Sequence, residues 1–149
     1  RKPRGMKLAV LGKYEDGNVY HQAVKAAAGN EVMFLGAIYD KKVVQALRFH
    51  SAAYVHGHQV GGTNPSLVEA LGAGNAVIAH DNRFNRWVAG PGAAFFDGAA
   101  GFATQLDAIL ADPTRLDSMR KASRERFLAE FQWEKILSEY ETLLLKYQK

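Results

Sequence analysis

The sequence contains no cysteine among its 149 residues, which excludes disulfides and thiolate metal ligands and makes a secreted, disulfide-rich domain a poor interpretation. It has no apolar run near the roughly 18 residues that span a bilayer. We find no signal peptide, internal repeat or low-complexity stretch in it. From these absences we expect a cytoplasmic location.

What the sequence does contain is the composition of an ordinary globular domain. Apolar residues make up 48% and charged residues 23%, and we expect residues 1–149 to form a single domain with its own core. The formal charge of +4 is too small to select a class of partner. The basic cluster Arg1-Lys2-Pro3-Arg4 is short, so we interpret it as a solvated terminus and expect no nucleic-acid partner.

Five short, almost continuous apolar segments occur before residue 97, as expected for strands that are buried on both faces of a sheet. We place these strands at Leu8–Leu11, Val32–Leu35, Ala52–Val55, Ala76–Ala79 and Ala93–Phe96. Segments with helical spacing separate the first four, and the last of these is a short helix over Pro65–Leu71. This alternation predicts an α/β fold with a parallel, Rossmann-like sheet and right-handed crossovers.

After Phe96 the pattern is helical only. A first helix ends at Asp112-Pro113, a second continues to Phe127, and a long amphipathic helix runs from Trp133 to Tyr147. We interpret the aromatic stripe of this last helix as core or as an interdomain surface.

The candidate site lies in the loops after the strands, because ligands bind beyond the carboxyl ends of the strands in an open parallel sheet. The richest loop is Gly61-Gly62-Thr63-Asn64-Pro65. Its glycines allow close approach to the backbone, Thr63 or Asn64 is a good N-cap, and Pro65 suits the first helical position. The helix start favours a phosphate. The alternative is a capped helix that only happens to follow a glycine turn.

Glu69 has two interpretations. Ser66-Leu67-Val68-Glu69 fits a capping box, in which the glutamate only completes the helix start. If Pro65 is the first helical residue, Ser66 is not the N-cap and the Glu69 carboxylate is free. We favour the second interpretation because proline prefers that position. A free carboxylate there can accept both hydroxyls of a ribose.

Other polar residues also follow the strands. His56 and His58 lie two apart at a strand end and face the same side, but no third metal ligand is evident, so we favour hydrogen-bonding roles. Arg83 or Arg86, in the loop from His80 to Trp87, is either a phosphate ligand or, as is commoner, a solvated arginine.

Four segments resemble the C-terminal, donor-binding domain of the family 4 glycosyltransferases, which are retaining enzymes of the GT-B fold. The matching segments, in order and at matching spacing, are Leu8–Gly12, Val32–Gly36, Glu69–Ala79 and Phe131–Glu134. The amino-acid sequence of residues 61–69 is most similar to that of the rhamnosyltransferase-like members. The resemblance implies an enzyme of polysaccharide biosynthesis that moves a hexose or deoxyhexose, with rhamnose a candidate.

The resemblance also implies roles for residues. Glu69 is similar to the second glutamate of the family's E-x7-E motif and would hold the ribose of a nucleotide-sugar donor. The pyrophosphate would meet Thr63, Asn64 and Ser66 at the helix start, beside Gly62 and His58, and the base would meet the main chain at Ala37 and Ile38. No D-x-D motif occurs, so no metal is expected. The acceptor would be a glycan or a lipid-linked glycan, and peripheral association with the inner membrane face fits such an acceptor.

The sequence departs from the family pattern in four ways. Gly61 replaces the first glutamate of E-x7-E, so sugar recognition must differ, and Pro65 removes one backbone donor. The family's first strand of this domain, with its arginine and lysine, has no counterpart before Leu8, and the acceptor domain has none either. We therefore expect a partial domain that is inactive alone.

Three rival functions remain. A dinucleotide-binding oxidoreductase is disfavoured because Gly12-Lys13-Tyr14-Glu15-Asp16-Gly17 does not form G-x-G-x-x-G. A non-catalytic nucleotide-binding or interaction domain would explain Gly61 as the sign of a dead site. A nucleotide-sugar epimerase is the most distant rival.

Overall fold

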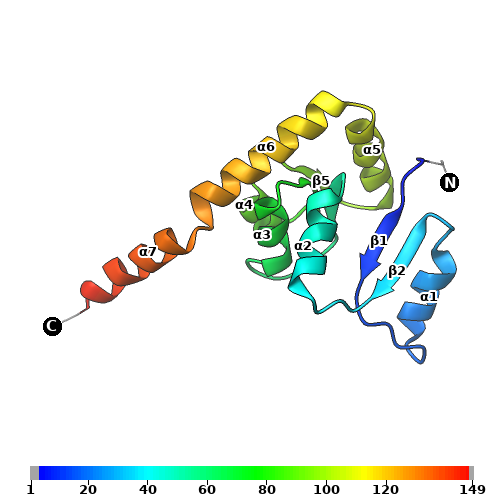
Figure 1. Cartoon of the computed structure of the whole chain (residues 1–149), viewed down its shortest axis with the longest axis horizontal. Coiled ribbons are helices and arrows are strands. Elements are labelled where there is room, and N and C mark those ends of the chain that lie inside the picture. The colour runs from blue at the N-terminus through cyan, green and yellow to red at the C-terminus, as the bar shows by residue number, and fades with distance from the viewer. Residues whose placement is uncertain (1–3, 148–149) are drawn as a thin grey trace. The chain divides into compact units, whose positions relative to one another are not determined.

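The computed structural model describes residues 4–147 and divides the chain into two compact units, Arg1–Ala46 and Leu47–Lys149 (Figure 1). Three residues of the predicted basic terminus, 1–3, lie outside the described residues. No helix within residues 4–147 is long and apolar enough to cross a membrane.

The first unit is a small βαβ arrangement. Strand β1 (Leu8–Leu11) pairs in parallel with β2 (Val32–Gly36), and helix α1 (Val19–Ala27) connects them. Asn18 is the N-cap of α1, because its side chain accepts hydrogen bonds from the next turn of backbone amides. Helix α2 (Lys41–His50) then leads into the second unit.

The second unit is built on a three-stranded parallel sheet in the order β3-β4-β5. Its strands are β3 (Ala53–His56), β4 (Ala76–His80) and β5 (Ala94–Phe96). Its helices are α3 (Pro65–Gly72), α4 (Arg83–Ala89), α5 (Ala99–Leu110), α6 (Pro113–Glu130) and α7 (Trp133–Leu145). Because the strands are parallel, all three carboxyl ends lie along one edge of the sheet.

The core lies on both faces of β4, whose side chains alternate between two apolar clusters. On one face Val77 and Ala79 pack with Leu67 and Leu71 of α3. On the other face Ile78 packs with residues of α5 and α6. Strand β4 is therefore covered on both sides, as its continuous apolar sequence predicts.

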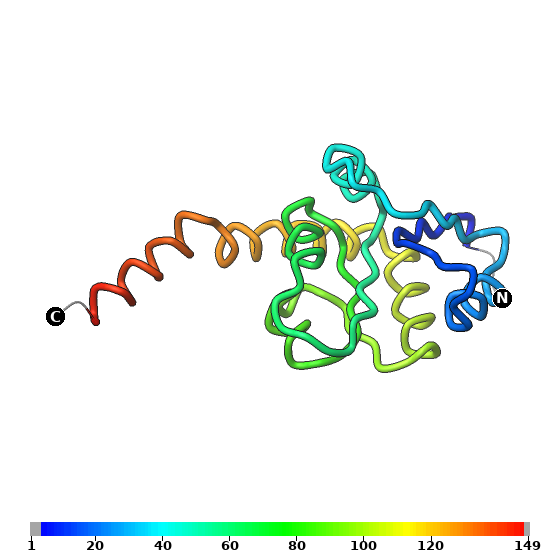
Figure 2. Tube along the Cα trace, turned by 90° about the horizontal axis from the view of Figure 1, so that it is seen from below, coloured from blue at the N-terminus to red at the C-terminus, as the bar shows by residue number. Residues whose placement is uncertain are grey.

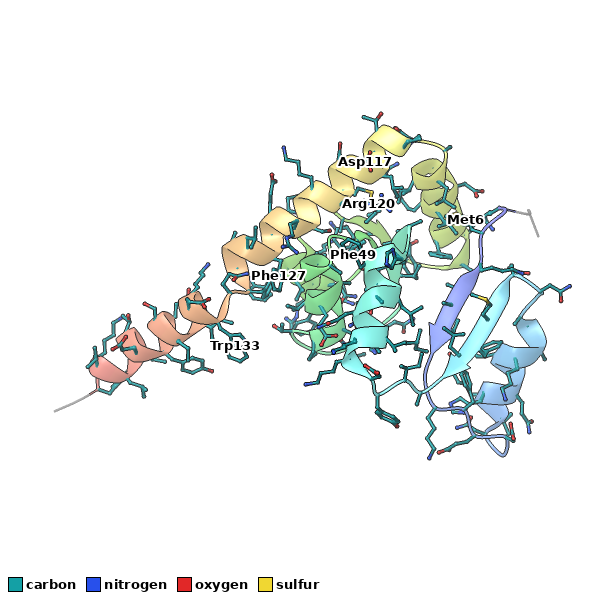
Figure 3. The ribbon with its side chains drawn as sticks, in the orientation of Figure 1. Met6, Phe49, Asp117, Arg120, Phe127 and Trp133 are labelled. Carbon is teal, nitrogen blue, oxygen red and sulfur yellow. The ribbon has the colours of Figure 1, made fainter. Side chains whose placement is uncertain are left out.

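Helix α6 is fixed to the unit by arginines that donate to main-chain carbonyls. Arg120 reaches the carbonyl of Ala52 at 3.3 Å, Arg124 reaches Gly72, and Arg126 reaches Trp87 at 2.6 Å. Figure 3 shows Arg120 and Phe127 on this helix, and the Phe127 ring packs on the apolar cluster of α3. The carbonyls at the ends of α3 and α4 thereby gain charged donors.

Helix α7 extends beyond the end of α6 with no other element of its unit beside it (Figure 2). Its apolar side chains are largely exposed, and Trp133 keeps 72% of its surface accessible. Of the two interpretations of its stripe, core is therefore wrong for this helix, and an interdomain surface stays a prediction.

The α/β prediction is confirmed, and each predicted strand is present within one residue at each end. Three details differ. The strands pair in two groups, β1-β2 and β3-β4-β5, where one sheet was expected. Leu8, Leu11 and Met33 are exposed, so β1 and β2 are not buried on both faces as their apolar sequence predicts. The stretch interpreted as a loop after β4 contains α4.

Candidate functional site

The loop at the carboxyl end of β3 opens directly onto the start of α3. Gly61, Gly62 and Thr63 are exposed, so no other side chain seals the turn. Pro65 is the first helical residue and Asn64 is the N-cap. The predicted helix start is therefore confirmed, with Asn64 rather than Thr63 as the cap.

Asn64 occupies part of the hydrogen-bonding capacity of this turn. Its side-chain oxygen accepts from the amide of Ser66 at 3.1 Å and from the Ser66 hydroxyl at 2.7 Å. A ligand must compete with Asn64 for both donors of Ser66. In the described part of the chain, the amides of Gly61, Gly62 and Thr63 donate to no protein acceptor. These three amides are the open donors in front of the helix.

Gly61 has a backbone conformation that only glycine adopts readily. Its φ is +131°, a region that residues with a Cβ rarely occupy. The glutamate that the family pattern places at this position would therefore strain the backbone here.

Glu69 is not part of a capping box. Its carboxylate lies one turn into α3 and is 58% exposed, and its Oε2 is 2.7 Å from Nη1 of Arg48 on α2. The other carboxylate oxygen has no protein donor among residues 4–147. The prediction of a carboxylate free of the helix start is confirmed, and its ion pair with Arg48 is a contact that the sequence did not indicate.

His56 and His58 stand in a row of rings on β3 and the loop after it. The His56 ring stacks on His58 with centroids 4.6 Å apart and on Tyr54 with centroids 6.0 Å apart. His56 is 1% exposed, and its Nε2 has no hydrogen-bond partner among the described residues. Burial, and then the nearby charge of His58, lower the pKa of His56 to about 4, so it is neutral near pH 7.

The model of the family described as "Glycosyl transferases group 1" matches residues 2–126. The chain belongs to the group 1 glycosyl transferases. No curated protein sequence matches it.

Two solved structures share the fold of this glycosyl transferase domain. One is a sucrose-phosphate synthase from Thermosynechococcus elongatus, with a TM-score of 0.77 and 23% identity over 94% of this chain and 38% of that chain. The other is HepE from Anabaena in complex with UDP, with a TM-score of 0.77 and 16% identity over 97% of this chain and 42% of that chain. The chain thus spans about two fifths of the length of each.

The main-chain positions predicted to meet the base belong to the first unit of this glycosyl transferase. Ala37 is exposed and Ile38 is half-buried, and both follow the carboxyl end of β2. Gly36 before them has φ +73°, which turns the chain out of the strand. Lys13, after β1, forms an exposed ion pair with Glu15 at 3.2 Å.

The edge after β4 contains a second set of polar residues. Arg86 binds both carboxylate oxygens of Asp81, at 2.5 and 2.6 Å, and this hydrogen bonding lowers the pKa of Asp81. Arg86 is therefore already paired, whereas Arg83 lies over the ring of Phe84 at 4.6 Å. Of the two arginines that the sequence analysis considered for phosphate binding in this glycosyl transferase, Arg83 is therefore the more available.

Buried asparagines, which the sequence analysis missed, hold the site loops in place. Asn85 of α4 is buried and donates to the carbonyls of His58 and His80, each at 2.9 Å. It ties the loop after β3 to the end of β4. Nothing in the local pattern marks Asn85, because its partners are 27 and 5 residues away. Within residues 4–147, His, Asp and Glu form no group of three that could hold a metal ion.

Proposed function

We propose that this chain is the donor-binding domain of a retaining, family 4 glycosyl transferase that uses a nucleotide diphosphate sugar. One observation carries the proposal. The open amides of Gly61, Gly62 and Thr63 lie before the N-terminus of α3, and the Glu69 carboxylate lies one turn inside the same helix. That spacing suits a diphosphate followed by a ribose.

The diphosphate would bind at the helix start. The N-terminus of α3 carries partial positive charge, and in this turn the loop amides are exposed to solvent. In the structure, the amide and the hydroxyl of Ser66 donate to the side-chain oxygen of Asn64, at 3.1 and 2.7 Å. When a diphosphate binds, its oxygens would replace Asn64 as the acceptor of these two hydrogen bonds. The helix start and nearby cations would stabilise the leaving diphosphate without a metal ion.

The ribose of the nucleoside would bind through Glu69. A carboxylate has about four lone-pair sites, so Glu69 can accept from two ribose hydroxyls while one site serves Arg48. Ala37 and Ile38, after β2, would meet the base with their main-chain groups. HepE, which has the same fold, is solved with UDP bound, and this supports a nucleotide ligand.

The donor sugar would be a hexose or deoxyhexose. Gly61 offers no carboxylate to sugar hydroxyls, which favours a less hydroxylated sugar such as rhamnose. The acceptor, a glycan or a lipid-linked glycan, would bind to other parts of the full-length protein, with peripheral association at the inner membrane face. Because this chain spans only about two fifths of its solved relatives, it would bind donor without transferring sugar.

The test is calorimetric titration of the chain with UDP, TDP and GDP, compared with the Glu69→Ala variant. Loss of the ribose contacts should weaken the best nucleoside diphosphate about tenfold, which corresponds to roughly 1.4 kcal/mol. Glu139→Ala is the matched control, because Glu139 is an exposed glutamate on α7. No binding of any of the three nucleotides, or equal affinity of the wild type and Glu69→Ala, would contradict the proposal.

A further inference from the structure

Arg48 holds one oxygen of the carboxylate that is proposed to bind ribose. Its Nη1 lies 2.7 Å from Oε2 of Glu69. The two side chains differ in exposure, at 16% for Arg48 and 58% for Glu69. The arginine therefore sits largely inside the unit while the carboxylate faces solvent.

The main chain of Arg48 is fixed from the interior. Its carbonyl accepts from the Asn75 side chain at 2.7 Å and from the Ser51 hydroxyl at 2.8 Å. Asn75 is 1% exposed and also donates to the Ser51 hydroxyl at 3.0 Å. A buried residue at the start of β4 thus holds the end of α2, from which the guanidinium reaches α3.

The ion pair between Arg48 and Glu69 adds little to folding stability, but it restricts the rotamers of the Glu69 side chain. An ion pair with one partner more than half exposed contributes little to folding stability. An unpaired surface glutamate samples several rotamers, and a ligand that binds it must immobilise them at a cost in affinity. Arg48 removes that cost, since it holds the Glu69 carboxylate by one oxygen and leaves the other open.

We infer that Arg48 is a positioning residue for ribose recognition: it orients the Glu69 carboxylate to accept hydrogen bonds from the two ribose hydroxyls of a nucleoside diphosphate. The inference rests on the proposed function of this site. It goes beyond that proposal because Arg48 does not touch the ligand itself. Its effect should be confined to ligands that contain a ribose, and should disappear when Glu69 is absent.

The experiment measures affinity for two probes by calorimetry. The first is the tighter-binding of UDP and GDP, which both carry a ribose with two hydroxyls, and the second is inorganic pyrophosphate, which shares the diphosphate but has no ribose. The variants are Arg48→Met, which keeps the aliphatic stem, Arg48→Lys, Glu69→Ala and the double variant. Arg115→Met is the matched control, because Arg115 is exposed on α6 and pairs there with Gln105 at 3.2 Å.

Arg48→Met should bind the nucleoside diphosphate about fivefold more weakly, with pyrophosphate affinity unchanged. Without Arg48 the Glu69 side chain samples several rotamers, and the ribose must immobilise them on binding. Arg48→Lys should lie between Arg48→Met and the wild type, because a lysine keeps the charge without the planar fork. The double variant should be no weaker than Glu69→Ala, as for residues that act through one another.

Three results would overturn the inference. These are an unchanged nucleoside diphosphate affinity in Arg48→Met, an equal loss for both probes, and losses that add in the double variant. If Arg48→Met does not fold, Arg48→Gln replaces it, since its amide keeps a hydrogen-bonding head without the charge. A wild-type affinity in Glu69→Ala instead contradicts the ribose site itself, so failure of the proposed function is distinguished from failure of this inference.

Discussion

At the scale of single residues, the row Tyr54, His56 and His58 places an uncharged imidazole inside the edge of the sheet. His56 is buried against rings on both sides and has an Nε2 without a partner among the described residues. Charging such a group costs free energy, which is why its pKa falls to about 4. The folded state therefore binds fewer protons here than the unfolded chain does.

This difference predicts a pH dependence of stability. The unfolded chain takes up the proton of His56 below its ordinary pKa of about 6.5, while the folded chain resists until about pH 4. Stability should fall as the pH drops through this window, by about 2 kcal/mol between pH 7 and 5. Urea unfolding of wild type and His56→Phe at both pH values measures it.

The His56→Phe variant should lose most of that pH dependence, whereas His50→Phe, at an exposed histidine on α2, should retain it. His58 and Tyr54 face the same ring and stay in place in both variants. An unchanged slope in His56→Phe would show that another group carries the effect.

At the scale of elements, helix α6 approaches the loop between α4 and β5 so closely that one position must be glycine. A Cβ on Gly92 would lie 2.4 Å from the Cβ of Ala122 on α6. The crossing of helix and loop depends on this small pair of residues. Neighbouring arginines, Arg124 and Arg126, hold the same stretch of α6 through main-chain carbonyls.

Gly92→Ala should therefore destabilise the chain by about 1 to 3 kcal/mol, as overpacking does. Thermal unfolding measures the change. Ala122→Gly in the same chain should recover part of the loss, because it removes the opposing methyl group. Gly57→Ala is the control, since a Cβ there meets nothing within 4 Å. A Gly92→Ala variant as stable as Gly57→Ala would mean that α6 shifts at no cost.

The sequence predicted those elements whose signals are local. Continuous apolar runs marked the strands, and the Asn64-Pro65 pair marked the start of α3, because capping and proline geometry depend on adjacent residues. Helix α4 was missed because its seven residues make too few turns to display a helical period. Arg48 was missed because its partner lies 21 residues away in sequence (69 − 48), and only the folded chain brings the two side chains together.

At the scale of the whole molecule, the residues predicted to contact the donor fall in two stretches of the sequence. The diphosphate and ribose positions, from Gly61 to Glu69 with Arg48, all belong to Leu47–Lys149. The proposed base contacts, Ala37 and Ile38, belong to Arg1–Ala46.

We expect the chain of 149 residues to bind a nucleoside diphosphate and to transfer no sugar. The measurement compares nucleotide release from UDP-, TDP- and GDP-sugars by this chain and by the full-length protein, in the presence of a glycan acceptor. In the full-length protein, Glu69→Ala should lower kcat/KM for the nucleotide-sugar donor roughly tenfold, in line with the expected tenfold loss of donor affinity. Turnover by the chain alone would contradict this prediction.

The order of these predicted contact residues along the sequence has a consequence for engineering. The choice of nucleobase would be encoded in residues 1–46, and the grip on the rest of the nucleotide would be encoded downstream. A chimera that exchanges only residues 1–46 with a relative should thus alter which nucleobase is preferred, while its affinity for pyrophosphate stays unchanged.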